Sequence, residues 1–125
     1  MEFRMEERTP TLVAGYSCHG IEFYDEASMD GGTFFYMAAA RLPRIEDLPE
    51  DMVAKLLPGG SYAVFEHRGS VATLAATFGA AYSEALPAAG LEPAGRLDFE
   101  RYDARFKSPA DPDSIVEIWI PVRKR

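Results

Sequence analysis

Cysteine, histidine and tryptophan are scarce in this sequence of 125 residues, and their scarcity excludes several kinds of site. The single cysteine, Cys18, rules out an intramolecular disulfide and a multi-cysteine zinc site, and it is compatible with the cytoplasm. The two histidines, His19 and His67, lie in different segments with no third ligand at metal spacing. We therefore expect surface or hydrogen-bonded roles for both, and no metal or other cofactor.

Long apolar runs and an excess of basic residues are also missing. No apolar stretch approaches the roughly 20 residues that cross a bilayer, and the charged start MEFRMEER does not resemble a signal peptide. The formal net charge of -7 argues against binding to a nucleic-acid backbone and mildly favours cationic ligands. We expect a soluble cytoplasmic protein that binds neither nucleic acid nor membrane directly.

Familiar catalytic and DNA-binding patterns are absent as well. The sequence contains no GxxxxGK[ST], HExxH, GxSxG or CxxC motif, which weakens the common enzyme readings. The first 60 residues contain no helix-turn-helix pattern. A transcription regulator would therefore need its DNA-binding part on another chain.

The plainest positive signal is a strand at 114–122. Its even positions form one aliphatic face, and its odd positions form a mixed face that carries Glu117 and Trp119, the only tryptophan. The aliphatic face is expected to pack in the hydrophobic core. The second is either a solvated edge or the wall of a cavity for a flat, cationic ligand, and the strand pattern alone leaves both open.

The rest of the chain predicts an α+β fold in one domain, residues 1–125, with a mostly antiparallel sheet. His19-Gly20 should break the first strand, and Asp30-Gly31-Gly32 is typical of a hairpin turn. Further strands are expected at 11–18, 21–24, 33–40, 52–57, 61–67 and 97–105.

One helix is expected, beginning after Ser70 as N-cap and ending at Pro87, which lacks an amide donor. Apolar residues recur there at three- and four-residue spacing: Val71, Leu74, Ala75, Phe78, Tyr82 and Ala85.

Three segments together resemble the GyrI-like effector-binding domains, the ligand-binding domains of bacterial AraC- and MerR-type multidrug regulators, which also occur as stand-alone proteins. The segments are Pro58-Gly-Gly-Ser-Tyr-Ala-Val-Phe-Glu-His-Arg-Gly69, Leu97-Asp-Phe-Glu-Arg-Tyr102 and Val116-Glu-Ile-Trp-Ile-Pro-Val122. The likeness covers about residues 48–122.

The resemblance implies a duplicated strand-helix-strand-strand unit whose two helices flank a groove for bulky, apolar, often cationic compounds. It places the family's buried glutamate at Glu117. Two departures stand out: Ala85 replaces a tryptophan of the family, and Cys18 runs almost directly into Gly20, so the helix of the first unit is missing.

These considerations predict a stand-alone domain that sequesters or senses lipophilic cations. If apolar rings surround Glu117, desolvation should raise its pKa. The expected ligand-binding residues are Glu117, Trp119, Glu100, Tyr102, Tyr36, Phe65, Phe78 and Tyr82. The alternatives are a hydrolase of cyclopropane-type genotoxic compounds, with Glu117 or Glu100 as general base, and a gyrase-inhibitor-like protein-interaction module.

The missing helix also bears on assembly. It should leave apolar sheet surface near Leu12 and Phe34 uncovered, and large exposed apolar patches usually find partners. We expect a homodimer that covers this surface. The alternative is a monomer in which the segment 21–29 folds back as an irregular lid.

Overall fold

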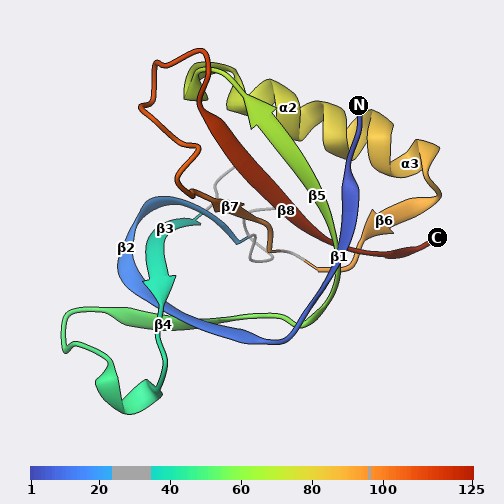
Figure 1. Ribbon diagram of the computed structural model, residues 1–125. Helices are drawn as coiled ribbons and strands as arrows, with labels where there is room; N and C mark the ends of the chain where they lie inside the picture. The colour runs from blue at the N-terminus through green and yellow to red at the C-terminus, as the bar shows by residue number, and fades with distance from the viewer. Residues whose placement is uncertain (24–34, 96) are drawn as a thin grey trace. The chain divides into compact units, whose positions relative to one another are not determined.

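The computed structural model of the protein describes residues 1–23, 35–95 and 97–125 (Figure 1). The chain forms two compact units, with residues 1–6 and 61–125 in unit 1 and residues 7–60 in unit 2. Five strand pairs in the described residues are antiparallel, and unit 1 carries a helix. This confirms the predicted α+β class. The predicted hairpin turn at 30–32 lies outside the described residues.

Unit 1 is built on a five-stranded sheet with β8 at its centre. The strands follow the order β1-β5-β8-β6, and β7 also pairs with β8. β8 confirms the strand predicted at 114–122 and continues as far as Lys124. The bounds are β1 (Arg4–Arg8), β5 (Gly60–Arg68), β6 (Leu91–Pro93), β7 (Phe99–Arg101) and β8 (Ile115–Lys124).

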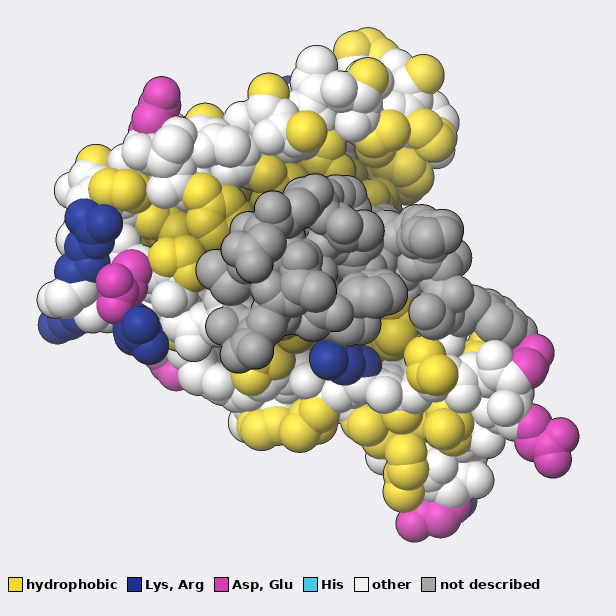
Figure 2. Space-filling view, turned by 180° about the vertical axis from the view of Figure 1, so that it is seen from behind, with side chains coloured by type: hydrophobic (Ala, Val, Ile, Leu, Met, Phe, Trp, Pro, Cys, Tyr) yellow, Lys and Arg dark blue, Asp and Glu magenta, His cyan; other side chains and the backbone are white. Residues whose placement is uncertain are grey.

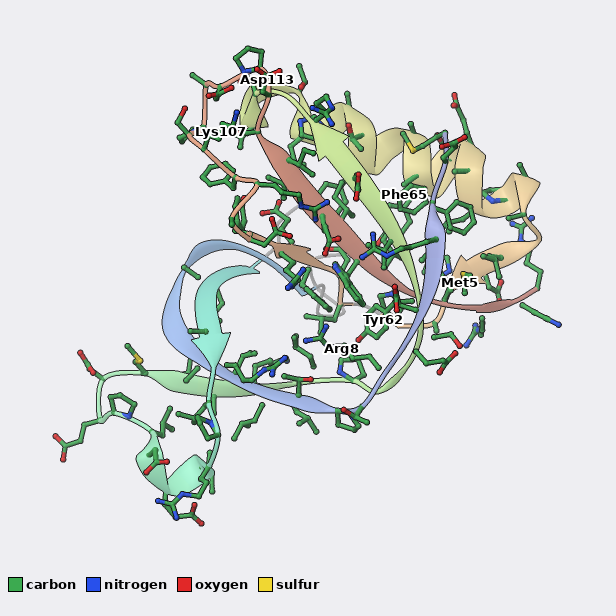
Figure 3. All side chains as sticks on the ribbon, in the orientation of Figure 1. Met5, Arg8, Tyr62, Phe65, Lys107 and Asp113 are labelled. Carbon is green, nitrogen blue, oxygen red and sulfur yellow. The ribbon has the colours of Figure 1, made fainter. Side chains whose placement is uncertain are left out.

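The helix covers one face of this sheet and encloses the main core of unit 1 (Figure 1). Phe65 and Ile118 are paired across β5 and β8, and both are buried beneath the helix. Figure 3 shows Phe65 beside the helix. Burying a side chain of this size stabilises the fold by roughly 1.5 to 3 kcal/mol. The other buried members of the cluster are Ala63, Leu74, Ala81, Leu86, Ile120 and Val122.

The helix begins as predicted but ends later than predicted. Ser70 caps it, because its hydroxyl accepts a hydrogen bond from the amide of Ala72. Pro87 does not stop it, and the helix continues to Ala88. A π-helical turn precedes Pro87, and its wider backbone relieves the clash of the proline ring with the preceding turn. The four segments are η2 (Val71–Thr73), α2 (Leu74–Ala80), η3 (Ala81–Ala85) and α3 (Leu86–Ala88).

Three elements of unit 1 differ from the sequence-based expectation. The strand predicted at 97–105 is shorter, since β7 ends at Arg101 and the side chain of Asp103 accepts a hydrogen bond from the amide of Arg105, which forms a turn. The strands β1 and β6 were not predicted. β1 carries charged side chains at alternate positions and lacks an apolar face, and β6 is only three residues long.

Unit 2 is a three-stranded sheet in which β2 (Thr11–Phe23) lies between β3 (Phe35–Arg41) and β4 (Val53–Leu57). The break predicted at His19-Gly20 is wrong, because β2 runs through both residues. The sequence signal instead marks an irregularity in the register with β3, between Cys18 and Phe23.

The described part of unit 2 contains no α-helix, only the short 3-10 turn η1 (Ile45–Asp47). The family helix would fall between β2 and β3, a connection that includes residues 24–34, outside the described residues. The core of unit 2 includes Val13, Ala14, Met37 and Leu57. Across the described ranges of the whole chain, no helix has the length and apolar character needed to cross a membrane.

Candidate functional site

Glu117 and Trp119 lie on the face of the unit 1 sheet that is opposite the helix. Their neighbours Ile118 and Ile120 belong to the helix-facing core, so strand alternation turns Glu117 and Trp119 the other way. Both side chains are nevertheless buried, and Glu117 is only 2% exposed. The mixed face of β8 is therefore not a solvated edge.

An aromatic cluster adjoins the carboxylate on this face. The rings of Phe99 and Trp119 are stacked with centroids 5.5 Å apart, and Tyr62 meets both rings edge-on, at 5.6 Å and 5.8 Å. Strand register brings two of the rings together, because Phe99 of β7 lies opposite Trp119 of β8. The indole nitrogen of Trp119 donates a 3.1 Å hydrogen bond to Oε1 of Glu117, which joins the cluster to the carboxylate.

Three arginine side chains hold the Glu117 carboxylate. Arg4 of β1 donates to Oε2 from Nη2 at 2.7 Å, and Arg105 donates to the same oxygen at 3.0 Å. Arg101, the register partner of Glu117 on β7, donates to Oε1 at 3.1 Å. The guanidinium carbon of Arg4 also lies 5.9 Å from the centroid of the Trp119 ring, within cation–π range.

Further carboxylates hold these arginines in turn. Asp103 pairs with Arg105 at 2.8 Å, and Glu66 pairs with Arg105 at the same distance. Glu6 binds Arg4 at 2.9 Å along β1. The network thus joins three guanidinium groups to four carboxylates among the described residues.

The network fixes the ionisation state of Glu117. Burial raises the pKa of Glu117, but hydrogen bonds from Arg4, Trp119, Arg101 and Arg105 outweigh it and leave the pKa at about 2. The predicted rise in pKa is therefore wrong, because charged donors rather than apolar rings surround the oxygens. Hydrogen bonds from Arg105 likewise lower the pKa of Asp103 to about 2.

Several of the predicted ligand-binding residues lie on the other face of the sheet. Phe65, Phe78 and Tyr82 pack in the core between the sheet and the helix, so the structure does not bring them to Glu117. Tyr82 has a partner of its own, since its hydroxyl donates to the buried carboxylate of Asp98. The three aromatic side chains stabilise the helix-facing core.

Glu100 and Tyr102 also lie apart from Glu117. Glu100 is opposite Ile118 in the register, which places it on the helix-facing side at the end of the sheet. The hydroxyl of Tyr102 donates to Glu100 at 2.8 Å, and Tyr102 is exposed. The remaining predicted residue, Tyr36, belongs to unit 2, where its backbone pairs with Cys18.

Five residues that surround Glu117 were not predicted from the sequence: Arg4, Tyr62, Phe99, Arg101 and Arg105. One signal could have found two of them, Phe99 and Arg101. Phe99, Arg101 and Asp103 alternate along the chain, and pairing this stretch with β8 turns Phe99 and Arg101 to the side of Trp119 and Glu117. No such signal marks Arg4, which is 113 residues from Glu117.

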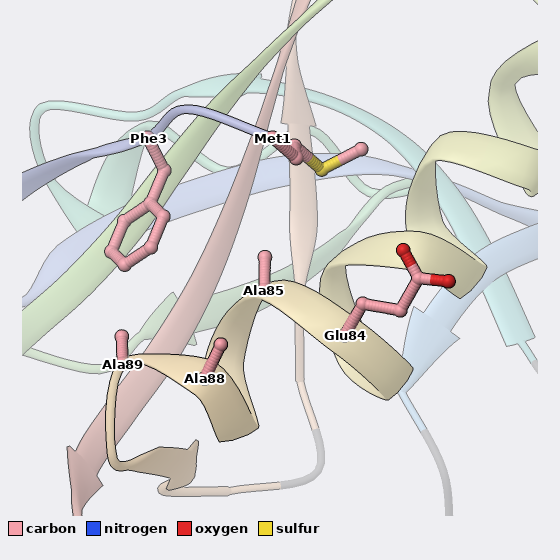
Figure 4. A pocket seen from close by; sticks show the side chains of 6 residues that line it. All are labelled: Met1, Phe3, Glu84, Ala85, Ala88 and Ala89. Atoms are coloured by element: carbon pink, nitrogen blue, oxygen red, sulfur yellow. The ribbon is translucent and has the colours of Figure 1, made fainter.

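A separate hollow of about 350 Å³ opens on the helix side of unit 1. Met1 and Phe3 point from the N-terminal segment toward the helix, which contributes Glu84, Ala85, Ala88 and Ala89 (Figure 4). Its lining includes none of the residues that hold Glu117.

Comparison with known families and sequences gives two matches. The profile of the family described as "GyrI-like small molecule binding domain" matches residues 1–123. The transcriptional regulator BrlR of Pseudomonas aeruginosa is 42% identical over 96 residues, which are 77% of this chain and 36% of the regulator. The aligned part thus spans about a third of that relative.

Solved structures share the fold at low sequence identity. SAV2435 bound to tetraphenylphosphonium superposes with a TM-score of 0.74 at 16% identity, covering 98% of this chain and 94% of the other. The C-terminal domain of EcmrR gives a TM-score of 0.67 at 11% identity, covering 99% and 98%. EcmrR is also known in complex with DNA.

Proposed function

Because the chain belongs to the family of GyrI-like small-molecule-binding domains, we propose that it binds bulky, apolar organic cations, with Glu117 as the charge partner and Trp119 as an aromatic wall. In this proposal Tyr62 and Phe99 complete the aromatic wall. The domain would act by sequestering or sensing such compounds.

The observation that carries the proposal is a buried, ionised carboxylate hydrogen-bonded to a three-ring aromatic cluster. Burying an ionised carboxylate is costly without a compensating partner, and here three arginines supply the positive charge, so the site already holds a cationic group against the Trp119 ring. A delocalised cation can interact with the carboxylate while its apolar groups stack on the rings, which adds about 0.5 to 2 kcal/mol per cation–π contact.

Two relatives support this choice of ligand and role. SAV2435, which shares the fold, binds tetraphenylphosphonium, a bulky apolar cation. BrlR is a transcriptional regulator, so a sensing role is consistent with the sequence relationship. Tetraphenylphosphonium is accordingly the first probe to use.

The ionisation of Glu117 disfavours the hydrolase alternative with this residue as general base. A general base works best when its pKa lies near the working pH. The pKa of Glu117 is about 2, because three arginines and an indole hold the charged form. Such a carboxylate is a weak base and a good counter-ion.

We also propose that the protein is a cytoplasmic homodimer. The homodimer is expected because large apolar side chains are exposed in unit 2, and Figure 2 shows hydrophobic side chains at the surface. Of the two residues predicted to mark uncovered surface, Leu12 is half-buried and Phe34 lies outside the described residues. The exposed side chains in unit 2 include Ile45, Val53 and Leu56.

Calorimetric titration with two ions of matched shape tests the proposed function. Tetraphenylphosphonium and tetraphenylborate have nearly the same size and apolar surface but opposite charge. The proposal predicts binding of the cation and much weaker binding of the anion. Equal binding of both ions, or of neither, would contradict it.

A substitution in the separate hollow controls for the location of the site. Ala88 is exposed and lines the hollow, so Ala88→Trp should fill it without touching Glu117. Affinity for tetraphenylphosphonium should be unchanged in this variant. A large loss would assign the ligand to the hollow instead.

A further inference from the structure

The guanidinium group of Arg4 occupies the position relative to Glu117 and Trp119 that a ligand cation would need. It lies 2.7 Å from Oε2 of Glu117 and 5.9 Å from the Trp119 ring centroid. These two contacts, one with a carboxylate and one with an aromatic face, are those expected of a bound organic cation.

We infer that Arg4 is an internal competitor for the cation subsite, so that a ligand binds by displacing the Arg4 side chain from Glu117. The inference rests on the proposed function, since it concerns the same site. It adds a specificity-determining residue, because a ligand must interact with the carboxylate and the indole better than a guanidinium group does.

The other two arginines are less suited to this role. Arg105 is held by Asp103 through several hydrogen bonds and by Glu66 at 2.8 Å, so its position is fixed independently of Glu117. Arg101 lies beside Glu117 through strand register and bonds the oxygen that also accepts from Trp119.

Arg4 differs from both in its contact with the aromatic cluster, because its guanidinium carbon lies 5.9 Å from the centroid of the Trp119 ring. The Arg4 side chain is 41% exposed and lies on β1, the terminal strand in the order of the sheet. Its other acidic partners are Glu6 on the same strand, which already accepts from its Nε at 2.9 Å, and Glu66 at 3.8 Å. The Arg4 side chain can therefore leave Glu117, because its positive charge stays paired with Glu6 and accessible to solvent.

Displacement by a monovalent cation would also balance the charges of the network. Three guanidinium groups and four carboxylates form the network among the described residues. A monovalent cation that replaces Arg4 at Oε2 restores the contact with Glu117, and the remaining arginines stay in place. The subsite thus fits one positive charge next to an aromatic face.

The test compares tetraphenylphosphonium affinity for the wild-type chain, Arg4→Gln, Arg101→Gln and Arg123→Gln. Arg4→Gln should bind about tenfold more tightly, as expected when one charge-assisted hydrogen bond no longer has to be broken. Arg123 pairs with Glu92 at 2.7 Å in an exposed ion pair outside the network, so Arg123→Gln should match the wild type.

The outcomes separate this inference from the proposed function. If the wild type binds tetraphenylphosphonium and Arg4→Gln binds equally or more weakly, the inference fails while the function stands. An equal or larger gain in Arg101→Gln would overturn the assignment to Arg4. Absence of binding in every chain would overturn the proposed function and the inference with it.

A spectroscopic readout on the wild type covers the case in which Arg4→Gln folds poorly. The side-chain Nη–H signals of Arg4 in a ¹⁵N NMR spectrum should shift when tetraphenylphosphonium is added, because Nη2 loses its contact with Glu117. The signal of Arg123 should stay in place. An unshifted Arg4 signal at saturation would contradict displacement.

Discussion

Arg4 and Glu117 are 113 residues apart in the sequence and are joined by a 2.7 Å ion pair in the structure. The pair connects β1 at one end of the sheet order to β8 at its centre. It places a half-exposed positive charge on a buried negative one beside Trp119. The geometry of this pair underlies both the proposed ligand chemistry and the expected pH dependence of stability.

Acid should destabilise the protein in part through Glu117. Its pKa falls from an ordinary 4.5 to about 2 on folding, so its contribution is fully present above pH 4.5 and is lost as the pH falls toward 2. The full contribution is on the order of 3 kcal/mol. Urea unfolding at a series of pH values should therefore show a declining free energy of unfolding over this range.

The variant Glu117→Gln serves as the control for this pH dependence. Its free energy of unfolding should decline less steeply below pH 4.5, because the titrating group is gone. Some decline should remain, since the pKa of Asp103 is also lowered to about 2. Identical slopes in the wild type and the variant would show that the pKa of Glu117 is not depressed by folding.

Tyr82→Phe should lower stability and leave ligand binding intact. The hydroxyl of Tyr82 bonds the buried carboxylate of Asp98 on the helix side of the sheet, away from Glu117. Removing one partner of a buried hydrogen bond costs roughly 1 to 3 kcal/mol. Chemical denaturation measures the cost, and titration with tetraphenylphosphonium checks the affinity. A weakened affinity at unchanged stability would restore Tyr82 to the binding site.

The homodimer can be tested by light scattering at micromolar concentration. We expect a mass of twice 13.8 kDa for the wild type. Leu56 is 57% exposed on β4 in unit 2, so Leu56→Ser should shift the equilibrium toward the monomer if this apolar surface forms the interface. A mass of 13.8 kDa that does not change with concentration would rule out the dimer.

Local patterns in the sequence predicted the parts of the fold whose residues carry their own signal. β8 was predictable because aliphatic residues alternate along it, and the start of the helix was predictable because Ser70 is a favoured cap. β1 was missed since Arg4 and Glu6 interrupt any apolar alternation. Their charges pair with each other and with residues of other strands, a feature that no local pattern reveals.

The candidate site was predictable only in its centre. Glu117 and Trp119 stand out as a carboxylate and an indole on one strand face, and the family resemblance strengthens both. The arginines did not stand out, because charged side chains in a sequence usually indicate solvent exposure. Arg101 in particular carries a charge that indicates an exposed position, whereas strand pairing brings it to Glu117. The pKa of Glu117 is lowered rather than raised because these arginines, which were not predicted, donate hydrogen bonds to its carboxylate.

Calorimetric titration of tetraphenylphosphonium into the wild type and into Glu117→Gln tests the central claim most directly. The substitution removes the negative charge and keeps the size of the side chain, and thermal unfolding confirms that the variant is folded. The account predicts that affinity falls roughly ten- to a hundredfold, as expected for the loss of a charge-assisted contact. Equal affinity in the wild type and in folded Glu117→Gln would contradict Glu117 as the charge partner of the ligand.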